Sequence, residues 1–251
     1  CSHAHGGSWN GMTLGTIGDV GAFSLGAAKN LTGGEGGVVI TNQEKIYWNC
    51  VDYHDLWSGS IRERLGIFRY LSWNYRLSEM QGALLNANLD LLEDQASHRS
   101  INGHFLTTVL ENMAGKTPLR HDPYVTRNAY HIFTFRYHSD DFDGLPRSAF
   151  AEALKAEGVP VSTGYERDCR KQPFFLDPAV DLQKVWPRDG AVDVDYRAMT
   201  CPKSEWLCEE ETIWIGQAVL LAERSEVAKI GEAIDKIFMN RRELLEVAAP
   251  L

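Results

Sequence analysis

A single lysine between two short apolar segments places the strongest constraint on how this chain can fold. The segment Ala22–Leu25 and the β-branched segment Gly37–Thr41 both have the residue types typical of strands. Lys29 lies in the turn that must join them, and the glycine-rich run Gly33–Gly37 follows it. Burial between two strands disfavours the charged ammonium and makes a neutral, nucleophilic amine more accessible. The pattern therefore predicts a strand, a lysine-bearing turn and a second strand.

An amine of this kind can form a Schiff base with a carbonyl compound, including that of pyridoxal 5'-phosphate (PLP). Without its neighbours, Lys29 also fits a structural lysine whose side chain reaches water from the end of a strand. The glycines allow the backbone to turn tightly and to approach a ligand closely. The chain lacks the GxxxxGK[ST] pattern, so the glycine-rich run does not indicate a nucleoside-triphosphate loop.

The residues from Ser24 to Gly37, SLGAAKNLTGGEGG, resemble the lysine motif of the DegT/DnrJ/EryC1/StrS aminotransferases. These are PLP enzymes that aminate keto-sugars or keto-cyclitols. The likeness keeps its order along the chain, in the segments Ala4–Gly6, Gly18–Gly21, Asn74–Gln81 and Asn240–Leu244. The resemblance implies an α/β protein of the aspartate-aminotransferase-like fold (PLP fold type I). Its large domain would have a mixed, mostly parallel sheet, followed by a smaller α+β C-terminal domain.

The resemblance also implies roles for residues around the cofactor. Lys29 is expected to hold PLP as a Schiff base and then to move a proton between the donor α-carbon and the cofactor. Ser24 is expected to bind the PLP phosphate. His3 stands where the family usually has Gln and is expected beside the cofactor ring, while His5 would hydrogen-bond the local turn. The two histidines form an HxH pair, but no compact set of Cys or carboxylate partners accompanies them, so no metal site is predicted.

Four further residues are implied to serve the substrates or a second subunit. Asn74 and Arg76 lie in the segment NYR, which crosses a dimer interface in this family. Asn74 is expected to contact the PLP phosphate of the other subunit of a homodimer. Arg76 is expected to bind the carboxylate of the amino donor, for which its planar guanidinium is suited. His131 and Tyr165 are expected where the smaller domain covers the substrate. On residue type alone, Asn74 and Arg76 also fit polar residues before a helix.

The resemblance implies Glu or Gln as the amino donor and a keto-sugar, often nucleotide-linked, or a keto-cyclitol as the acceptor. The segment Thr163–Phe175 is loosely similar to members that act on cyclitols, whereas Gly26–Ala28 departs from the bulkier residues of many members. Relatives that carry out dehydration have His in place of the lysine, so Lys29 favours transamination. A dehydratase, and an incomplete, non-catalytic dimerisation or binding fragment, are the alternatives.

Members of the family carry a substantial segment before the region that matches Cys1. That segment supplies the first strands and helices of the large domain, part of the phosphate site and an Asp that pairs with the pyridine nitrogen. We therefore expect the 251 residues to lack an N-terminal segment. Residues 1–115 would complete the PLP-binding large domain, and residues 116–251 would form the smaller domain.

Composition excludes several classes of protein. The net charge of -9 argues against a general nucleic-acid binder. No apolar run has the length of a membrane span, and the first residues lack the basic start and apolar centre of a signal peptide. The five cysteines form no CxxC pair, which favours free thiols in a cytoplasmic protein.

Hydrophobic periodicity predicts the main elements. A helix over 78–98, capped by Ser78, would bury a stripe made of Met80, Leu84, Leu85, Leu89 and Leu92. A second stripe, of Ile101, Phe105, Val109 and Met113, would continue that helix or begin another. Further helices are expected over 45–55, 148–157 and 225–245, and strands over 130–138, 159–163 and 212–215.

Overall fold

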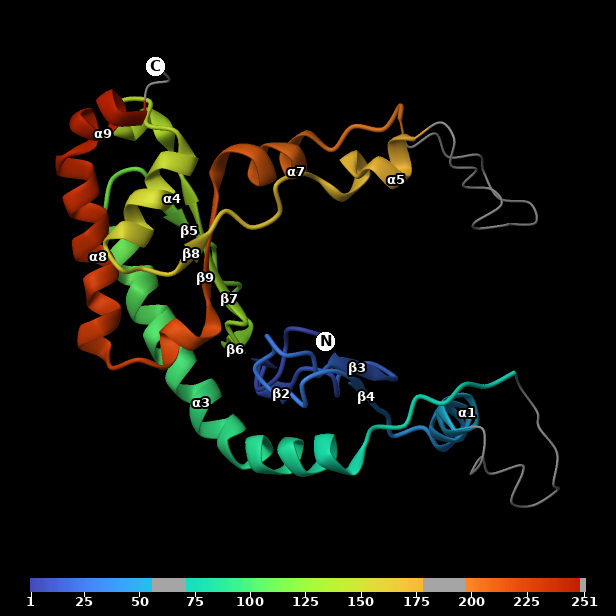
Figure 1. Ribbon diagram of the computed structural model, residues 1–251. Helices are drawn as coiled ribbons and strands as arrows, with labels where there is room; N and C mark the ends of the chain where they lie inside the picture. The colour runs from blue at the N-terminus through green and yellow to red at the C-terminus, as the bar shows by residue number, and fades with distance from the viewer. Residues whose placement is uncertain (56–70, 178–196, 249–251) are drawn as a thin grey trace, which may run out of the picture. The chain divides into compact units, whose positions relative to one another are not determined.

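The computed structural model describes residues 1–55, 71–177 and 197–248 (Figure 1). The chain divides into two compact units, each built from three segments. Unit 1 comprises Cys1–Leu106, Arg120–Phe133 and Gln217–Val227, and unit 2 comprises Thr107–Leu119, Thr134–Gly216 and Ala228–Leu251. The expected division into domains of residues 1–115 and 116–251 stays a prediction.

Unit 1 contains two small antiparallel sheets. In the first, β1 (Ser8–Trp9) pairs with both β2 (Met12–Thr13) and β6 (Val125–Arg127). In the second, β3 (Gly21–Ser24) pairs with β4 (Gly37–Ile40), which confirms the predicted strand, turn and strand around Lys29. The mostly parallel sheet expected for the large domain is not seen in the described part of unit 1. The connection between β1 and β2 and the lysine-bearing turn between β3 and β4 each reverse the direction of the chain, which produces antiparallel pairs.

The surface of unit 1 exposes many apolar side chains. None of the eleven residues of α1 (Glu44–His54) is buried, and its Tyr47, Trp48 and Tyr53 are exposed. Three of the four residues of β4 are exposed as well. The expectation that both strands beside Lys29 are buried is therefore wrong for β4, and in β3 only Gly21 is buried. Lys29 itself is half-buried.

One continuous helix, α3 (Glu79–Glu111), spans the first predicted apolar stripe and the second as far as Val109. Ser78 caps it as predicted: its Oγ accepts the N–H of Gln81 at 3.3 Å, and its own N–H donates to Gln81 Oε1 at 2.9 Å. This reciprocal pair is a capping box. The cap fixes where the helix begins and therefore which residues face the rest of unit 1.

The prediction that both stripes of α3 are core is wrong for much of their length. Met80 is 82% exposed, and Leu84, Leu89 and Ile101 are also exposed. Periodicity marks an apolar face, but burial needs a partner surface. Leu85 and Leu92 have such partners at Gly33 and Gly6. Later in the helix the buried residues include Ala96, Arg99, Asn102, Leu106 and Leu110.

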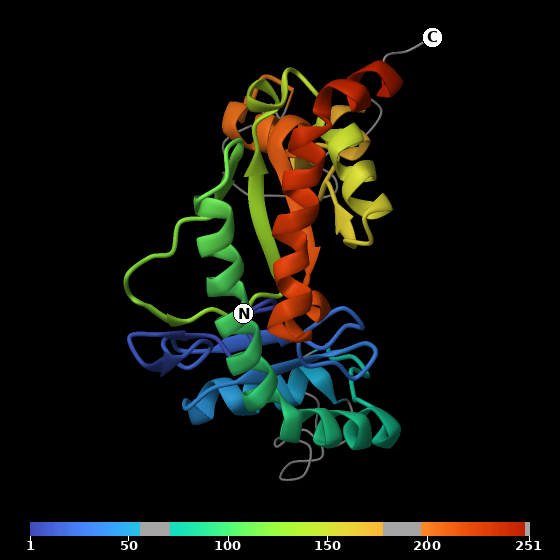
Figure 2. The same cartoon turned by 90° about the vertical axis from the view of Figure 1, so that its left-hand side faces the viewer.

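Unit 2 is built on a four-stranded sheet with the order β5 (Lys116–Pro118), β7 (Ile132–Tyr137), β9 (Thr212–Gly216), β8 (Val161–Ser162). Two helices, α4 (Arg147–Ala156) and α8 (Arg224–Met239), lie on one side of this sheet in both views (Figure 1, Figure 2). The strand β8 lies at an edge, as the proline before it predicts. The core is formed by Phe135, Tyr137, Phe150, Leu154, Ile213, Ile215, Ile230, Ile234 and Ile237.

The remaining helices are short. They are α5 (Pro173–Leu176), α7 (Pro202–Trp206) and α9 (Arg241–Ala248), so the helix expected over 225–245 is divided after Met239. All five cysteines are free thiols, as predicted. No helix in the described ranges combines the length and the apolar character that a bilayer span requires.

Lys116 in unit 2 allows a test of this core. Its ammonium lies 4.5 Å above the Phe142 ring, and burial lowers its pKa to about 8. In the unfolded chain the Lys116 side chain has its ordinary pKa of about 10.4. Between about pH 8 and pH 10.4 the unfolded chain therefore binds more protons than the folded protein does. Stability should therefore rise with pH across that window.

We expect Lys116→Met to remove this rise in the free energy of unfolding. The rise amounts to about 1.4 kcal/mol for each unit of difference between the folded and unfolded pKa values. Urea unfolding of both proteins between pH 7.5 and 10.5 measures it. The difference between the two stability curves isolates Lys116 from other groups that titrate. Parallel curves would contradict the assigned burial.

Candidate active site around Lys29

The turn that carries Lys29 is closed by its own main chain. The N–H of Leu25 donates to Gly36 O at 2.8 Å, and the N–H of Gly33 donates to Leu25 O at 3.0 Å. Inside this loop, the N–H of Lys29 donates to Gly26 O at 2.9 Å. The two strands therefore continue as a ladder to the base of the turn, and the lysine projects from a compact loop.

The helix α3 holds the far side of the same turn. Asn88 Nδ2 donates to Thr32 O at 2.9 Å, and Gln81 Nε2 donates to Glu35 O at 2.9 Å. Between them Leu85 packs on Gly33, where an added Cβ would lie 3.0 Å from Leu85 Cγ. Positions 81, 85 and 88 share one face of a helix. The glycine-rich run thus gives α3 close access to the backbone of the turn.

Two amide side chains that were not predicted from the sequence hold the peptide groups around Lys29. The buried Asn30 donates through Nδ2 to Ala129 O at 2.7 Å. Gln217 Nε2 donates to Lys29 O at 3.4 Å. Asn30 directly follows the lysine and could have been proposed from that position. Gln217 lies far along the chain and carries no local signal.

Two of the predicted site residues, His3 and His131, meet beside the lysine. Their ring centroids lie 4.1 Å apart. Burial lowers the pKa of His131 to about 4, and the positive charges of His3 and Lys29 act in the same direction. Burial, followed by the charge of Lys29, also lowers the pKa of His3. At neutral pH the His131 ring is therefore uncharged and can accept a hydrogen bond from a hydroxyl group.

The neighbouring His5 is buried, and its ring lies 5.1 Å from that of Phe23 on β3. Burial lowers its pKa, while the Ser24 backbone opposes this effect. Both ring nitrogens of His5 lack a hydrogen-bond partner among the described residues, so the hydrogen bond expected between His5 and the local turn is not seen. Among the described residues, no group of three His, Cys, Asp or Glu side chains is arranged to hold a metal ion.

A fully buried arginine adds to the positive potential of this region. Arg99 on α3 is 0% exposed, and its charge contributes to the lowered pKa of His131. Its Nε and Nη2 have no hydrogen-bond partner among the residues that the structure describes. Basic side chains thus gather around Lys29 in a chain whose net charge is -9. Such a local field favours an anionic ligand.

The residues present fit PLP, a phosphate-bearing aldehyde. Asn30 Oδ1, Gln217 Oε1 and His131 Nδ1 are buried and lack hydrogen-bond partners within the described parts of the chain. Buried polar atoms normally have partners, so these atoms leave room for a polar ligand or for water. Ser24 Oγ accepts the N–H of Gly26 at 3.4 Å, which leaves its hydroxyl hydrogen for a phosphate oxygen.

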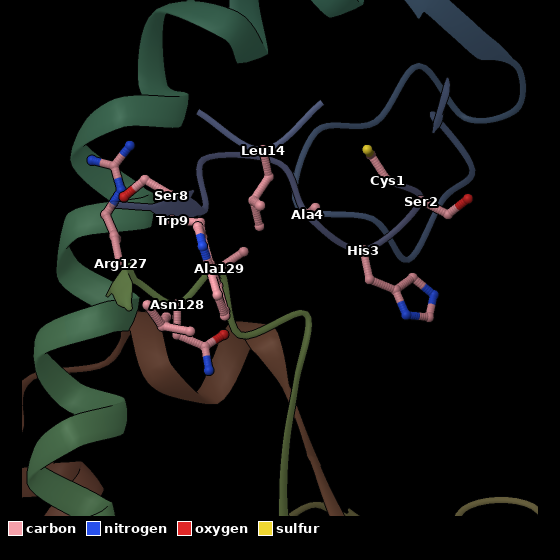
Figure 3. Close-up of a pocket in the computed structure, with 11 residues that line it drawn as sticks. Cys1, Ser2, His3, Ala4, Ser8, Trp9, Leu14, Arg127, Asn128 and Ala129 are labelled. Atoms are coloured by element: carbon pink, nitrogen blue, oxygen red, sulfur yellow. The ribbon is translucent and has the colours of Figure 1, made fainter. Parts of the chain in front are cut away.

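A pocket of about 470 Å³ in unit 1 is partly formed by the segment that bears His3. Its lining includes Trp9, Leu14, Arg127 and Asn128 (Figure 3). The His3 ring extends away from the Trp9 and Arg127 side of this pocket. Arg127 is engaged by a bidentate contact to Glu93. His3 therefore lines this pocket and also contacts the ring of His131.

The other predicted site residues lie elsewhere. Asn74 forms an isolated antiparallel bridge with Asp55, and Arg76 Nη1 lies 2.7 Å from Asp55 Oδ1. Tyr165 belongs to unit 2, where its exposed ring packs edge-on against Trp214. The structure thus brings His3, His131, Ser24 and Lys29 into one region, and the roles of all seven predicted residues stay predictions.

The charge environment of His131 can be measured directly. We expect its imidazole to titrate near pH 4 in an NMR titration, because burial and nearby positive charge disfavour protonation. Lys29→Met should raise this pKa, since it removes one of those charges. Lys45→Met, an exposed lysine on α1, is the matched control and should leave it unchanged. Titration near the ordinary value of about 6.5 would contradict the site geometry.

The chain shares its fold with solved aminotransferase-family structures. It superimposes on 3-amino-5-hydroxybenzoic acid (AHBA) synthase with a TM-score of 0.73 at 25% identity, covering 95% of this chain and 59% of that one. It also superimposes on DesI, solved in the presence of its TDP-sugar product, with a TM-score of 0.71 at 20% identity. These likenesses confirm the expected α/β fold class of the PLP-dependent aminotransferases.

Curated relatives match along nearly the whole chain. A putative L-glutamine:3-amino-2,3-dideoxy-scyllo-inosose aminotransferase of Micromonospora echinospora is 31% identical over 96% of this chain. The L-glutamine:2-deoxy-scyllo-inosose aminotransferase of Streptoalloteichus tenebrarius is 30% identical over 97% of it. The chain spans 57% and 59% of the length of these two relatives.

The model of the DegT/DnrJ/EryC1/StrS aminotransferase family matches residues 1–234. The match contains the lysine turn, the capping box of α3 and the histidine pair described above. It therefore covers both the residues that resemble the family motif and the elements that hold them in position. The chain belongs to the DegT/DnrJ/EryC1/StrS aminotransferase family.

Proposed function

We propose that this chain provides the lysine-bearing part of a PLP-dependent aminotransferase that moves an amino group from an amino acid to a keto-cyclitol or keto-sugar. The observation that carries the proposal is Lys29 in a turn held by both its own strands and α3, among basic and unpaired polar groups. When bound, PLP supplies an electron-withdrawing ring that stabilises negative charge at the donor α-carbon.

Lys29 has two tasks in this proposal. Its Nζ would hold the cofactor through the aldehyde carbon. As a free amine, the same Nζ would hold the proton that the donor α-carbon loses. Both tasks need Nζ at a fixed place, which the hydrogen bonds of Asn30 and Gln217 to neighbouring peptide groups support.

Ser24 and His3 serve as cofactor-binding residues. The Ser24 hydroxyl donates to the phosphate, as its unused hydrogen permits. His3 would lie beside the cofactor ring, and its imidazole contacts that of His131. His131, uncharged at neutral pH, accepts a hydrogen bond from a hydroxyl of the acceptor. The family resemblance gives Tyr165 a role toward the substrate. A polyhydroxylated acceptor offers many such hydroxyl donors, which supports a cyclitol or sugar.

The names of the relatives narrow the choice of donor and acceptor. Several are named as transferring from L-glutamine to an inosose. We therefore propose glutamine as donor and a keto-cyclitol of the inosose class as the first acceptor to test. The loose likeness of Thr163–Phe175 to cyclitol enzymes agrees with this choice. A nucleotide-linked keto-sugar is the second acceptor.

We also propose a homodimer with shared active sites and a cytoplasmic location. Asn74 would contact the phosphate in the other subunit, and Arg76 the donor carboxylate. The exposed apolar residues Trp73, Met80 and Leu84 near these two support a second copy as the occupant of this surface. Free thiols on all five cysteines support the cytoplasmic location.

The visible absorption of the purified protein with PLP tests the cofactor and its lysine. A yellow band that borohydride abolishes is expected, and Lys29→Ala should lack it because no amine remains to hold the aldehyde. Lys45→Ala is the control and should keep the band. A band unchanged in Lys29→Ala would contradict the proposal.

L-Glutamine should bleach this band, and adding scyllo-inosose should restore it. Mass analysis of the product separates transamination from the alternative chemistry, because an amine gains nitrogen whereas dehydration loses water. Binding of PLP with no transfer from any amino donor would favour the dehydratase alternative. No band at all would favour the non-catalytic alternative.

A further inference from the structure

The end of α1 and the segment that carries Asn74 and Arg76 are joined by main-chain pairing. An antiparallel bridge and two hydrogen bonds connect them. These contacts are Asp55 to Asn74, Trp73 N–H to Tyr53 O at 3.0 Å, and Tyr75 N–H to His54 O at 2.8 Å. The segment is therefore anchored on the last turn of a helix.

This pairing sorts the side chains of the segment onto two faces. In an extended segment alternate residues point to opposite sides, so Asn74 and Arg76 share one face. Trp73 and Tyr75 share the other, where their exposed rings stack with centroids 6.3 Å apart. The two residues that the family resemblance links to a ligand thus lie together, apart from the two aromatic residues.

Asp55 is the side chain that reaches Arg76 from the helix. The residue is only 6% exposed, and its Oδ1 accepts a hydrogen bond from Arg76 Nη1 at 2.7 Å. The arginine side chain is 41% exposed. A guanidinium has five N–H donors arranged as a rigid fork. Asp55 engages one end of this fork, and the partly exposed remainder can receive a second carboxylate.

Fixing the arginine in advance has an energetic consequence. A free arginine side chain loses rotamer entropy when a ligand orders it. An ion pair that already orders the side chain removes part of that cost from ligand binding. The buried carboxylate in turn depends on the arginine, because an unpaired buried charge is strongly unfavourable. Each partner therefore holds the other in place.

We propose that Asp55 is a positioning residue that orients the guanidinium of Arg76 to receive the α-carboxylate of the amino donor. The inference rests on the proposed function, since it takes Arg76 as the donor-binding residue. Asp55 does not touch the reacting atoms. Its effect should appear in binding of the carboxylate-bearing substrate and not in binding of the acceptor, because a keto-cyclitol has no carboxylate.

The test uses the intact protein loaded with PLP and the variants Asp55→Ala and Asp55→Asn. We expect Asp55→Ala to raise KM for L-glutamine roughly tenfold or more, the effect of losing one charged hydrogen bond. Asp55→Asn keeps an oxygen acceptor and should give a smaller rise. The KM for scyllo-inosose and kcat at saturating donor should stay within about twofold of the parent. Asp90→Asn, an exposed carboxylate on α3, is the matched control.

A second readout is independent of activity. The Arg76 Nε–H NMR signal should be sharp in the parent protein and broadened in Asp55→Ala, because the guanidinium becomes mobile. An unchanged KM for glutamine in a folded Asp55→Ala would overturn the inference. An equal rise in KM for donor and acceptor would also overturn it, since that result marks a purely structural ion pair.

If the proposed function is wrong, the kinetic experiment gives a different result. In that case the parent protein itself transfers no amino group from glutamine or glutamate, and both proposals are overturned together. A parent that transfers normally, beside an Asp55→Ala variant with normal donor kinetics, overturns the positioning role alone.

Discussion

The site depends on the hydrogen bonds that hold the turn between β3 and β4. Its ends are closed by the main chain, its glycine-rich side is held by Asn88 and Gln81 of α3, and the peptide of Lys29 is held by Gln217. These contacts come from segments far apart in the sequence. An amine on a flexible side chain can act as a base at one atom only if its backbone is fixed, so the fold contributes directly to the chemistry.

Electrostatics then distinguish this turn from an ordinary hairpin loop. Lys29, Arg99 and three histidines gather in one region of an acidic chain, and burial keeps His131 uncharged. The arrangement provides an anion-attracting surface with a neutral hydrogen-bond acceptor beside it. A phosphate-bearing cofactor and a hydroxyl-rich acceptor need these two properties together. The ion pair of Asp55 with Arg76 provides a second, separately held cation in the same unit.

The sequence predicted local features well and the partners of exposed faces poorly. The strands around Lys29, the Ser78 cap and the helix expected over 148–157 depend on nearby residues, and they were confirmed. The apolar stripe containing Met80 was predicted to be core, yet burial depends on a distant surface that periodicity does not specify. Gln217 and Asp55 were missed for the same reason, because their importance arises only from tertiary contacts. The roles of His3, Asn74, Arg76 and Tyr165 came from family resemblance alone.

Peptide mapping after borohydride reduction in the presence of PLP tests the central claim most directly. Reduction makes the link between the cofactor and its amine permanent, so mass spectrometry can locate it. If the turn presents Lys29 as described, the pyridoxyl group will be found on the peptide that contains Lys29, at a stoichiometry near one per chain. Labelling spread over exposed lysines such as Lys45, with Lys29 unmodified, would contradict the account.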